Sequence, residues 1–284
     1  MDHETEDPRT AIGVLHPGAM GVAVAASAAT CGNRVMWVAE GRSKATHQRA
    51  DAAGLEELAW LNSMVNQADM ILSICPPESA YEVAEDVRNL GYQGIYVDAN
   101  AISPETTRRI GTLVEGVGAE FVDGGIIGGP PWKPGISRLY LSGEAAPKVA
   151  RAFEGGPLEV IVLDAPVGAA SALKMAYASW TKGTSALLTA VQALAIQEGV
   201  LEPLRAEWSR GGDGLLKRAD GLGTAAAKAW RWVGEMEEIA VTYAGAGLPD
   251  GFHLAAAEVY RRLAEFKDDP NAPGGEELAK HLLK

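Results

Sequence analysis

The segment with the most recognisable chemistry is a glycine-containing turn near the N-terminus. Ile12 to Gly21 reads Ile-Gly-Val-Leu-His-Pro-Gly-Ala-Met-Gly, an apolar run followed by a turn and the start of a helical pattern. At such a turn, backbone N–H groups face the pyrophosphate of a dinucleotide, and glycine lets the backbone approach it. The usual G-x-G-x-x-G spacing is incomplete because its first position is a histidine. The turn predicts a dinucleotide site, with ordinary turn punctuation as the alternative. The expected cofactor contacts here are His16, Pro17, Gly18, Ala19, Met20 and Gly21.

A second polar turn follows the next apolar run, where Glu40, Gly41, Arg42, Ser43 and Lys44 stand in succession. At the end of the second strand of a dinucleotide fold, an acid binds the ribose 2′-hydroxyl and a basic residue accommodates a 2′-phosphate. Glu40 favours NAD, whereas the three residues from Arg42 onward favour NADP. We expect NADP, with NAD as the alternative, and contacts from Gly41, Arg42 and Ser43. A solvated loop in which Ser43 caps a helix is the other interpretation.

Lys174 is the candidate acid–base group. It lies in the second turn of a helical pattern that begins near Gly168, among apolar neighbours. Hydride transfer to a carbonyl places negative charge on the oxygen, which requires a proton donor or a fixed cation. Tyr177 and Thr181 share a helix face with this lysine. We expect Lys174 to act in catalysis with Tyr177 as a second candidate; the alternatives are a lysine that reaches solvent and a tyrosine in the core.

Two further features carry weaker signals. The loop Gly128-Gly-Pro-Pro-Trp-Lys-Pro-Gly135 is stiffened by three prolines and offers Trp132 as an apolar face, which suggests either a pocket wall or a rigid surface loop. Cys75 ends an apolar run and is expected to be a buried thiol rather than a nucleophile. The five histidines have no metal-ligand spacing, so no metal is expected.

These residues must be positioned by alternating strands and helices. From Ala11 onward, short β-rich runs alternate with helical patterns, which predicts an α/β fold with a doubly wound, mostly parallel Rossmann sheet. The expected strands are Ala11–Leu15, Arg34–Val38, Met70–Ile74, Gly94–Asp98, Glu120–Asp123, Arg138–Ser142 and Val160–Asp164. The expected helices between them are 19–30, 44–53, 79–89 and 104–117, the last with Ser103 as its cap and Pro104 at its first position.

The pattern changes after Pro166. Residues 168–199 contain no proline and no strand signal and predict one long helix, and further helices are expected at 203–210, 224–244, 251–267 and 276–283. We therefore expect an acidic tail (1–10), a dinucleotide-binding domain (11–165) and an all-α substrate and dimerisation domain (166–284).

Composition excludes several classes of partner. The 284 residues carry a net charge of -12, which repels polyanions and argues against nucleic acid. No apolar run approaches the roughly 20 residues of a membrane span, and the N-terminus does not have the pattern of a signal peptide. Two cysteines do not form a disulfide framework. A cytoplasmic protein that acts on a small molecule is expected.

Four motifs in order resemble those of the β-hydroxyacid dehydrogenase superfamily, which includes 6-phosphogluconate dehydrogenase and the imine reductases. Besides the glycine turn, they are Asp98-Ala-Asn-Ala-Ile-Ser-Pro104, Asp123-Gly-Gly-Ile-Ile-Gly-Gly129 and Gly168-Ala-Ala-Ser-Ala-Leu-Lys174, which is similar to the family's catalytic-lysine motif. More narrowly, the chain resembles a poorly characterised 6-phosphogluconate dehydrogenase-like branch with its own helical C-terminal domain.

The resemblance implies particular site residues and a quaternary state. It places Asn100 beside the nicotinamide, residues Cys75, Pro76 and Pro77 near a ribose, and a homodimer formed by the long helix. The implied substrate contacts are Gly125, Ile126, Ile127, Gly128, Trp132 and Thr181.

The chain departs from the family pattern at Ile127, where the family has serine, at Ala178, where it has asparagine, and at His16, where it has glycine. The resemblance implies an NADP-dependent oxidoreductase that moves a hydride between nicotinamide and a small carbonyl or hydroxy substrate. Lys174 would be the general acid in reduction and the general base in oxidation. An imine reductase, an enzyme of decarboxylating oxidation and a non-catalytic dinucleotide-binding sensor are the alternatives.

Overall fold

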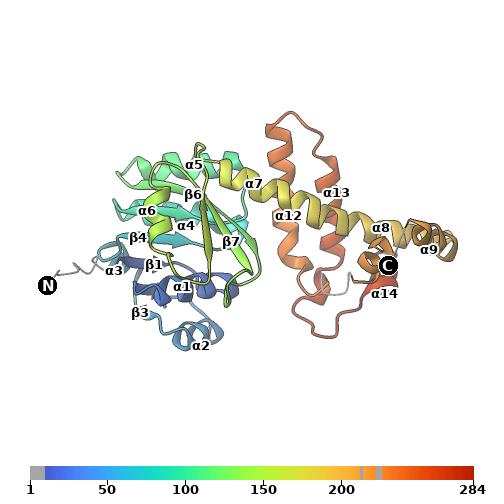
Figure 1. The fold of residues 1–284 in the computed structure, drawn as a ribbon, viewed down its shortest axis with the longest axis horizontal. Coiled ribbons are helices and arrows are strands. Elements are labelled where there is room, and N and C mark those ends of the chain that lie inside the picture. The colour runs from blue at the N-terminus through green and yellow to red at the C-terminus, as the bar shows by residue number, and fades with distance from the viewer. Residues whose placement is uncertain (1–9, 212–213, 222–225) are drawn as a thin grey trace. The chain divides into compact units, whose positions relative to one another are not determined.

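The computed structural model describes residues 10–211, 214–221 and 226–284. Most of the expected acidic tail therefore lies outside the described residues. The chain divides into two compact units, Met1–Lys174 and Met175–Lys284. Figure 1 shows the first unit as a sheet covered by helices and the second as helices only. The expected domain boundary at 165/166 lies in the loop before helix α7 (Ala169–Ala178), and the two units divide inside that helix.

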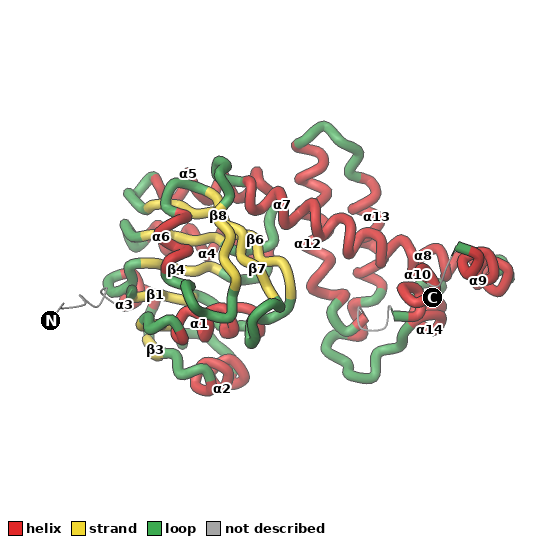
Figure 2. The backbone as a smooth tube through the Cα atoms, in the orientation of Figure 1, coloured by secondary structure: helices red, strands yellow, loops and turns green. Residues whose placement is uncertain are grey.

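Eight strands form one sheet in the order β3-β2-β1-β4-β5-β6-β7-β8 (Figure 2). The strands from β1 to β6 pair in parallel, β7 is antiparallel to β6, and β8 is parallel to β7. Chain order reverses direction between β1 and β4, which makes their carboxyl ends the switch point where such sheets bind ligands. The strands are β1 Ala11–Val14, β2 Arg34–Val38, β3 Glu56–Leu58, β4 Met70–Ser73, β5 Ile95–Asp98, β6 Glu120–Gly128, β7 Ser137–Ser142 and β8 Glu159–Val162.

Helices cover both faces of this sheet, as a parallel sheet of apolar strands requires. On one face, α1 and α6 pack against an apolar cluster that contains Val24, Val149 and Phe153. On the other face, α3, α4 and α5 contribute Met64, Val87 and similar side chains to a second cluster. The helices of this unit are α1 Ala19–Thr30, α2 Lys44–Ala52, α3 Leu61–Val65, α4 Ala80–Asn89, α5 Pro104–Glu115 and α6 Ala146–Arg151.

Local capping explains where α5 begins. The Ser103 hydroxyl accepts a hydrogen bond from the Thr106 N–H at 3.1 Å, and Pro104 occupies the first helical position. Serine satisfies an N–H that has no partner inside the helix, and proline has no N–H there to satisfy. The cap expected from the sequence is confirmed.

The second unit is a set of packed helices. They are α8 Thr184–Gln197, α9 Leu201–Arg210, α10 Gly214–Asp220, α12 Ala229–Gly245, α13 Gly251–Arg262 and α14 Gly275–His281. A π-helical turn, Ser179–Gly183, joins α7 to α8, so helical residues continue without a break from Ala169 to Gln197, as expected. The Tyr260 hydroxyl donates to the Lys182 carbonyl at 2.7 Å, which satisfies a backbone group of this turn.

The α/β fold class is confirmed, with several differences in detail. Strand β6 continues to Gly128, so residues 124–128, expected as a loop, belong to a strand. Strand β3 and the helices α3, α6 and α10 are not among the expected elements. None of the helices in the described ranges is long and apolar enough to cross a bilayer.

Candidate functional site

The glycine turn lies at the carboxyl end of β1, the switch point of the sheet. Gly21 is buried in the first turn of α1, and a Cβ there would come within 2.2 Å of the His16 carbonyl oxygen. A Cβ on Gly18 would meet nothing within 4 Å, so the front of the turn is open. The α1 N-terminus begins at Gly18 without a side-chain cap and without an acid in its first turn. These features suit an anion held by backbone N–H groups.

One polar side chain of this turn and one of the turn after β2 have buried atoms without a partner. The Nδ1 of His16 and the Nε of Arg42 are buried without a hydrogen-bond partner among the described residues. Burial lowers the pKa of His16 to about 4, and the positive charge of Arg42 acts in the same direction. Buried polar groups are normally paired, so both atoms point to a missing ligand. An anionic cofactor fits them.

The turn after β2 contains a glycine in a left-handed conformation and a serine that caps the next helix. Gly41 has a φ of +70°, a conformation that glycine adopts without strain. The Ser43 hydroxyl caps α2 by accepting a hydrogen bond from the Thr46 N–H at 3.3 Å, as the helix-cap alternative predicted. Arg49 on α2 donates to the Pro17 carbonyl at 3.4 Å and ties α2 to the glycine turn.

Asn100 is held inside the sheet edge by a network of hydrogen bonds. Its Nδ2 donates to the Ser73 hydroxyl and to Asp98 Oδ2, each at 3.0 Å, and its Oδ1 accepts from the Cys75 N–H at 2.6 Å. The backbone N–H of Asn100 also donates to Asp98 Oδ1 at 3.0 Å. The amide therefore joins the ends of β4 and β5. Asn100 positions the loop at residues 75–77, and both of its Nδ2 hydrogens are already in use.

Burial also controls the acids and thiols of this edge. It raises the pKa of Asp98 to about 7, against the hydrogen bonds from Asn100, and the nearby Asp123 carboxylate adds repulsion. It raises the pKa of the Cys75 thiol to about 12. A nucleophilic cysteine requires a thiolate, so Cys75 is suited to packing rather than to attack.

Lys174 lies where α7 crosses the extended part of β6. A Cβ on Gly125 would come within 2.5 Å of the Ala170 carbonyl oxygen and 3.1 Å of the Lys174 Cβ. The helix therefore rests directly on the backbone of β6. Because Asp98, the last residue of β5, pairs in register with Asp123, Gly125 lies beyond the carboxyl end of β5. This is the edge of the sheet where the dinucleotide turn also lies.

The other expected substrate contacts divide between the two faces of β6. Ile127 lies two residues after Gly125 in the strand, so both are on the face toward α7. Ile126 belongs to the apolar cluster on the opposite face. Gly128 ends the strand with a φ of +123°. Trp132 is 55% exposed in the β6–β7 loop.

Tyr177 and Thr181 belong to the second unit. Tyr177 is 50% exposed. The Thr181 hydroxyl donates to the Tyr177 carbonyl at 3.0 Å, inside the helix. Their place beside a substrate stays a prediction.

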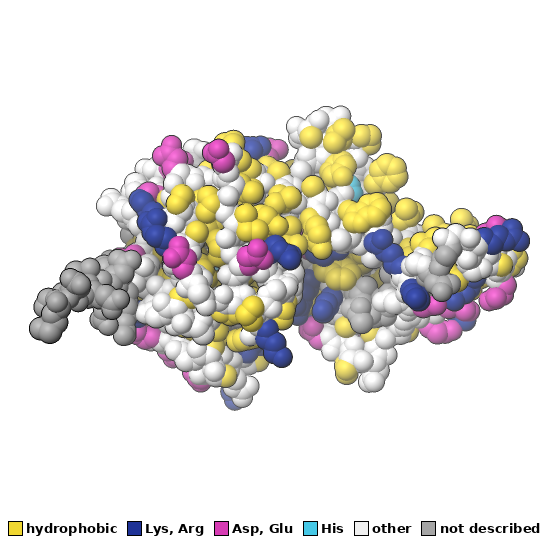
Figure 3. Space-filling view, viewed as in Figure 1, with side chains coloured by type: hydrophobic (Ala, Val, Ile, Leu, Met, Phe, Trp, Pro, Cys, Tyr) yellow, Lys and Arg dark blue, Asp and Glu magenta, His cyan; other side chains and the backbone are white. Residues whose placement is uncertain are grey.

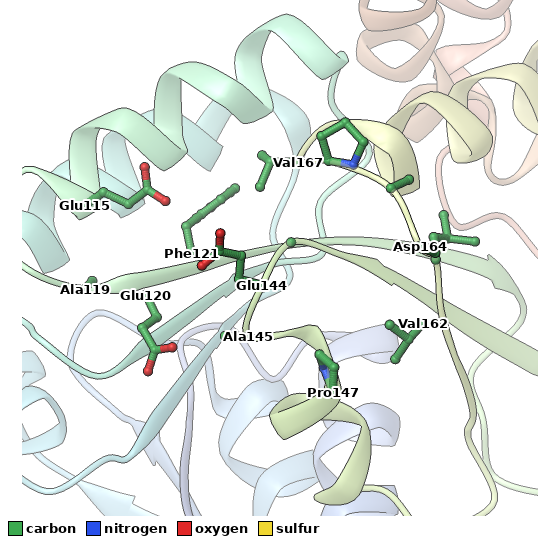
Figure 4. A pocket seen from close by; sticks show the side chains of 14 residues that line it. Glu115, Ala119, Glu120, Phe121, Glu144, Ala145, Pro147, Val162, Asp164 and Val167 are labelled. Atoms are coloured by element: carbon green, nitrogen blue, oxygen red, sulfur yellow. The ribbon is translucent and has the colours of Figure 1, made fainter.

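A cavity of about 880 Å³ lies elsewhere in the first unit, where β6 begins and β7 and β8 end. Figure 4 shows Glu115, Glu120, Glu144 and Asp164 around an apolar lining that includes Phe121. It lies away from the glycine turn and from Lys174, and its carboxylates disfavour an anionic ligand. Within the described ranges, no three His, Cys, Asp or Glu side chains come together as a metal site.

The sequence interpretation missed three contributors. Arg49 touches the glycine turn, Ser73 holds Asn100, and Asp123 binds the start of α7. The signal for the last was an acid at the end of an expected strand, a place where parallel sheets collect functional groups.

Two family models match this chain. Residues 11–133 match the NAD binding domain of 6-phosphogluconate dehydrogenase, and residues 195–263 match a domain of unknown function, DUF1932. An uncharacterised 28.5 kDa protein of Methanothermus fervidus, from the 7S RNA 5′ region, is 33% identical over 166 residues, which are 58% of this chain and 63% of that protein. The match thus spans less than two thirds of the relative.

Solved structures give the same fold. A conserved protein of unknown function, described as structurally similar to 3-hydroxyacid dehydrogenases, has a TM-score of 0.67 and 28% identity over 90% of this chain and 97% of that one. The 3-hydroxyisobutyrate dehydrogenase of Mycobacterium tuberculosis, solved with L-serine, has a TM-score of 0.71 and 18% identity over 97% of this chain and 99% of that one. At 18% identity, the similarity to the Mycobacterium tuberculosis enzyme concerns the fold alone.

The low pKa of His16 predicts a pH-dependent loss of stability. In the unfolded chain His16 takes up a proton near pH 6.5, and in the folded protein it does so near pH 4, so its contribution is complete above pH 6.5 and is lost as pH falls toward 4. Between pH 7 and pH 5, the wild type should lose up to about 2 kcal/mol more unfolding free energy than His16→Gln. Urea titrations at both pH values measure this difference, and His47→Gln, at a half-buried histidine that pairs with Glu57, serves as the control. An equal loss in wild type and His16→Gln contradicts the buried, neutral state of His16.

Proposed function

We propose a function from the family of this chain, which belongs to the 6-phosphogluconate dehydrogenase-like superfamily, with an NAD-binding domain followed by a DUF1932 domain. The chain is proposed to be an NADP-dependent oxidoreductase of a small carbonyl or hydroxy substrate, with Lys174 as its acid–base group. The observation that carries this proposal is the close packing of α7 on Gly125, which brings Lys174 to the carboxyl edge of the dinucleotide-binding sheet.

The residues of the first unit suit a bound dinucleotide. The uncapped start of α1 offers N–H groups to a pyrophosphate; the unpaired His16 Nδ1 lies at the same turn, and the unpaired Arg42 Nε lies at the turn after β2. The positive charge of Arg42 lowers the pKa of His16, so the guanidinium lies near the glycine turn. A guanidinium in this place suits the 2′-phosphate that distinguishes NADP from NAD.

The nicotinamide group, when bound, supplies or accepts the hydride. Lys174 then transfers the proton that neutralises the negative charge on the substrate oxygen. Its ammonium group donates this proton to the developing alkoxide in reduction, and its amine accepts it from the hydroxyl in oxidation. Gly125 leaves room for this side chain at the strand surface, and Asn100 fixes the loop at residues 75–77.

The substrate class follows from the lining of β6. The face toward α7 carries Gly125 and Ile127, neither of which offers a side-chain hydrogen bond to a carboxylate. A small substrate with an apolar part beside its reacting carbon therefore suits this wall. Because a carbonyl and an imine differ little in shape, an imine reductase is the second candidate.

Replacing the lysine tests the chemistry. In Lys174→Met, NADPH binding should be retained while turnover falls by about 10²–10⁴-fold, since a positioned acid or base contributes that much. Fluorescence titration with NADPH and turnover across a panel of carbonyls, imines and hydroxy acids measure the two quantities. Lys148→Met is the matched control because this lysine pairs with Glu120 on the surface.

The same panel separates the competing functions. Full turnover by Lys174→Met eliminates the lysine mechanism. NADPH binding without any turnover by the wild type favours a sensor, and turnover confined to imines favours an imine reductase.

Cofactor preference depends on Arg42. Arg42→Ala should weaken NADPH binding by about tenfold or more, the equivalent of one charge-assisted hydrogen bond, and leave NADH binding unchanged. Parallel titrations with both cofactors measure this, with Arg88→Ala on α4 as control. Tighter NADH than NADPH binding in the wild type would contradict the NADP assignment.

A homodimer is also proposed, supported by exposed apolar side chains on the second unit. Leu187 and Leu194 lie two turns apart on α8 and are 59% and 63% exposed. Figure 3 shows hydrophobic side chains gathered over α8 and over the α12–α13 pair. Apolar patches of this kind mark protein interfaces. The charge substitutions Leu187→Glu and Leu194→Glu should convert a dimer to a monomer in sedimentation velocity, whereas Leu90→Glu on the first unit should not. A monomeric wild type refutes the dimer.

A further inference from the structure

The first turn of α7 is capped by the sheet rather than by its own sequence. The residue before the helix is Gly168, which has no side chain and a φ of +99°. The N–H groups of Gly168, Ala170 and Ser171 precede the first helical bond, from the Ala172 N–H to the Gly168 carbonyl. Such groups need partners from outside the helix. Here the partners come from β6 and β7.

Asp123 on β6 supplies most of them. Its Oδ2 accepts from the Gly168 N–H at 2.9 Å and from the Ser171 N–H at 3.1 Å. Its Oδ1 accepts from the Ser171 hydroxyl at 2.6 Å. The carboxylate is fully buried, and its negative charge faces the positive end of the helix dipole. Backbone and hydroxyl donors of one helical turn thus hold both oxygens of Asp123.

Ser142 on β7 completes the cap. Its hydroxyl donates to Asp123 Oδ2 at 2.8 Å and accepts from the Ala170 N–H at 3.2 Å. Asp123 and Ser142 are directly paired in the antiparallel ladder, so the sheet fixes the position of both. The Ser171 hydroxyl also lies 2.8 Å from the Thr107 hydroxyl on α5. The start of α7 is thereby tied to two strands and a helix of the first unit.

Lys174 follows Ser171 by three residues and so lies on the same side of α7, one turn later. Gly125, two residues after Asp123 on the same face of β6, contacts Ala170 and the Lys174 Cβ. Asp123 and Gly125 therefore both determine how α7 packs on β6. The carboxylate of Asp123 fixes the position of the helix along the strand, and Gly125 allows the helix to lie close to the strand.

We propose that Asp123 is the positioning residue of Lys174, anchoring α7 so that the lysine is held at the cofactor edge of the sheet. This inference rests on the proposed function for the role of Lys174, and on the hydrogen bonds above for the anchor itself. Asp123 acts through the helix and takes no part in proton transfer.

The test compares Lys174 labelling with and without cofactor. An amine-selective acetylating reagent is applied to the full chain in the presence and absence of saturating NADPH, and the Lys174 peptide is quantified by mass spectrometry. NADPH should slow labelling of Lys174 in the wild type. In Asp123→Asn, which keeps the size of the side chain and removes its charge, this protection should be lost while the Kd for NADPH stays unchanged.

Amide exchange and kinetics give independent readouts. Hydrogen exchange at residues 168–172 should be faster in Asp123→Asn than in the wild type, because their N–H partners are weakened. With any substrate that the panel identifies, kcat should fall by about 100-fold without a change in the KM for NADPH, the cost of a small misplacement of a reacting group. A residue needed only for stability would not separate kcat from KM.

Two further variants keep the test decisive. Ser171→Ala removes the 2.6 Å bond to Oδ1 and the 2.8 Å contact with the Thr107 hydroxyl but leaves the Asp123 carboxylate in place, and it should give a partial loss of protection even if Asp123→Asn does not fold. Asp69→Asn is the matched control, since the Asp69 carboxylate accepts from the Ala11 N–H at 2.8 Å at the far end of β1. It should reduce stability and leave Lys174 protection intact.

Full protection of Lys174 in a folded Asp123→Asn, or a loss of NADPH binding in that variant, overturns the positioning role. If NADPH does not slow Lys174 labelling in the wild type, the proposed function is wrong. Exchange at residues 168–172 then still decides the anchor, because unchanged exchange in Asp123→Asn means that the carboxylate does not hold α7.

Discussion

Two buried carboxylates, Asp98 and Asp123, stand side by side at the carboxyl edge of the sheet, and the geometry of the candidate site depends on them. They are paired in register on β5 and β6. The carboxyl oxygens of each accept hydrogen bonds from a segment outside the sheet. Asp98 binds Asn100 and, through it, the loop after β4, and Asp123 binds the start of α7. The placement of Asp98 is costly. Burial raises the pKa of Asp98 to about 7, so its contribution to stability is largest at acidic pH and is lost as pH rises through that value.

The hydrogen bonds from Asn100 offset part of this cost, whereas the rest of the sheet is apolar. Strands β1 and β4 are covered on both faces, and their residues are buried almost without exception. At the strand ends, the N–H groups of loops and helix starts are available to satisfy buried polar atoms such as those of Asp98 and Asp123.

Local patterns predicted the elements and the glycine turn, because a helix cap such as Ser103 and an alternation of apolar runs depend on near neighbours in sequence. What they could not predict depends on distant ones. Strand β6 continues past Asp123 because β7 pairs with it, although Gly124 and Gly125 have low strand propensity. Strand β3 carries exposed glutamates at the sheet edge and has no apolar alternation. The expected contact of Asn100 with a cofactor stays a prediction, and the internal network of Asn100 was not predicted, because its partners Ser73 and Asp98 come together only when β4 and β5 lie side by side.

The net charge of the chain and the groups at the glycine turn lead to different expectations for an anionic ligand. A net charge of -12 predicts repulsion of polyanions, yet the glycine turn presents an uncapped helix N-terminus, a buried neutral histidine and an arginine with an unpaired Nε. Screening limits the reach of surface acids to about 8 Å at physiological salt, so these few groups determine the potential that a phosphate meets at the turn. Two buried acids of this edge, Asp98 and Asp123, accept hydrogen bonds from N–H and hydroxyl donors of the first unit. The same hydrogen bonds that position Asn100 and α7 therefore also satisfy these carboxyl groups inside the protein.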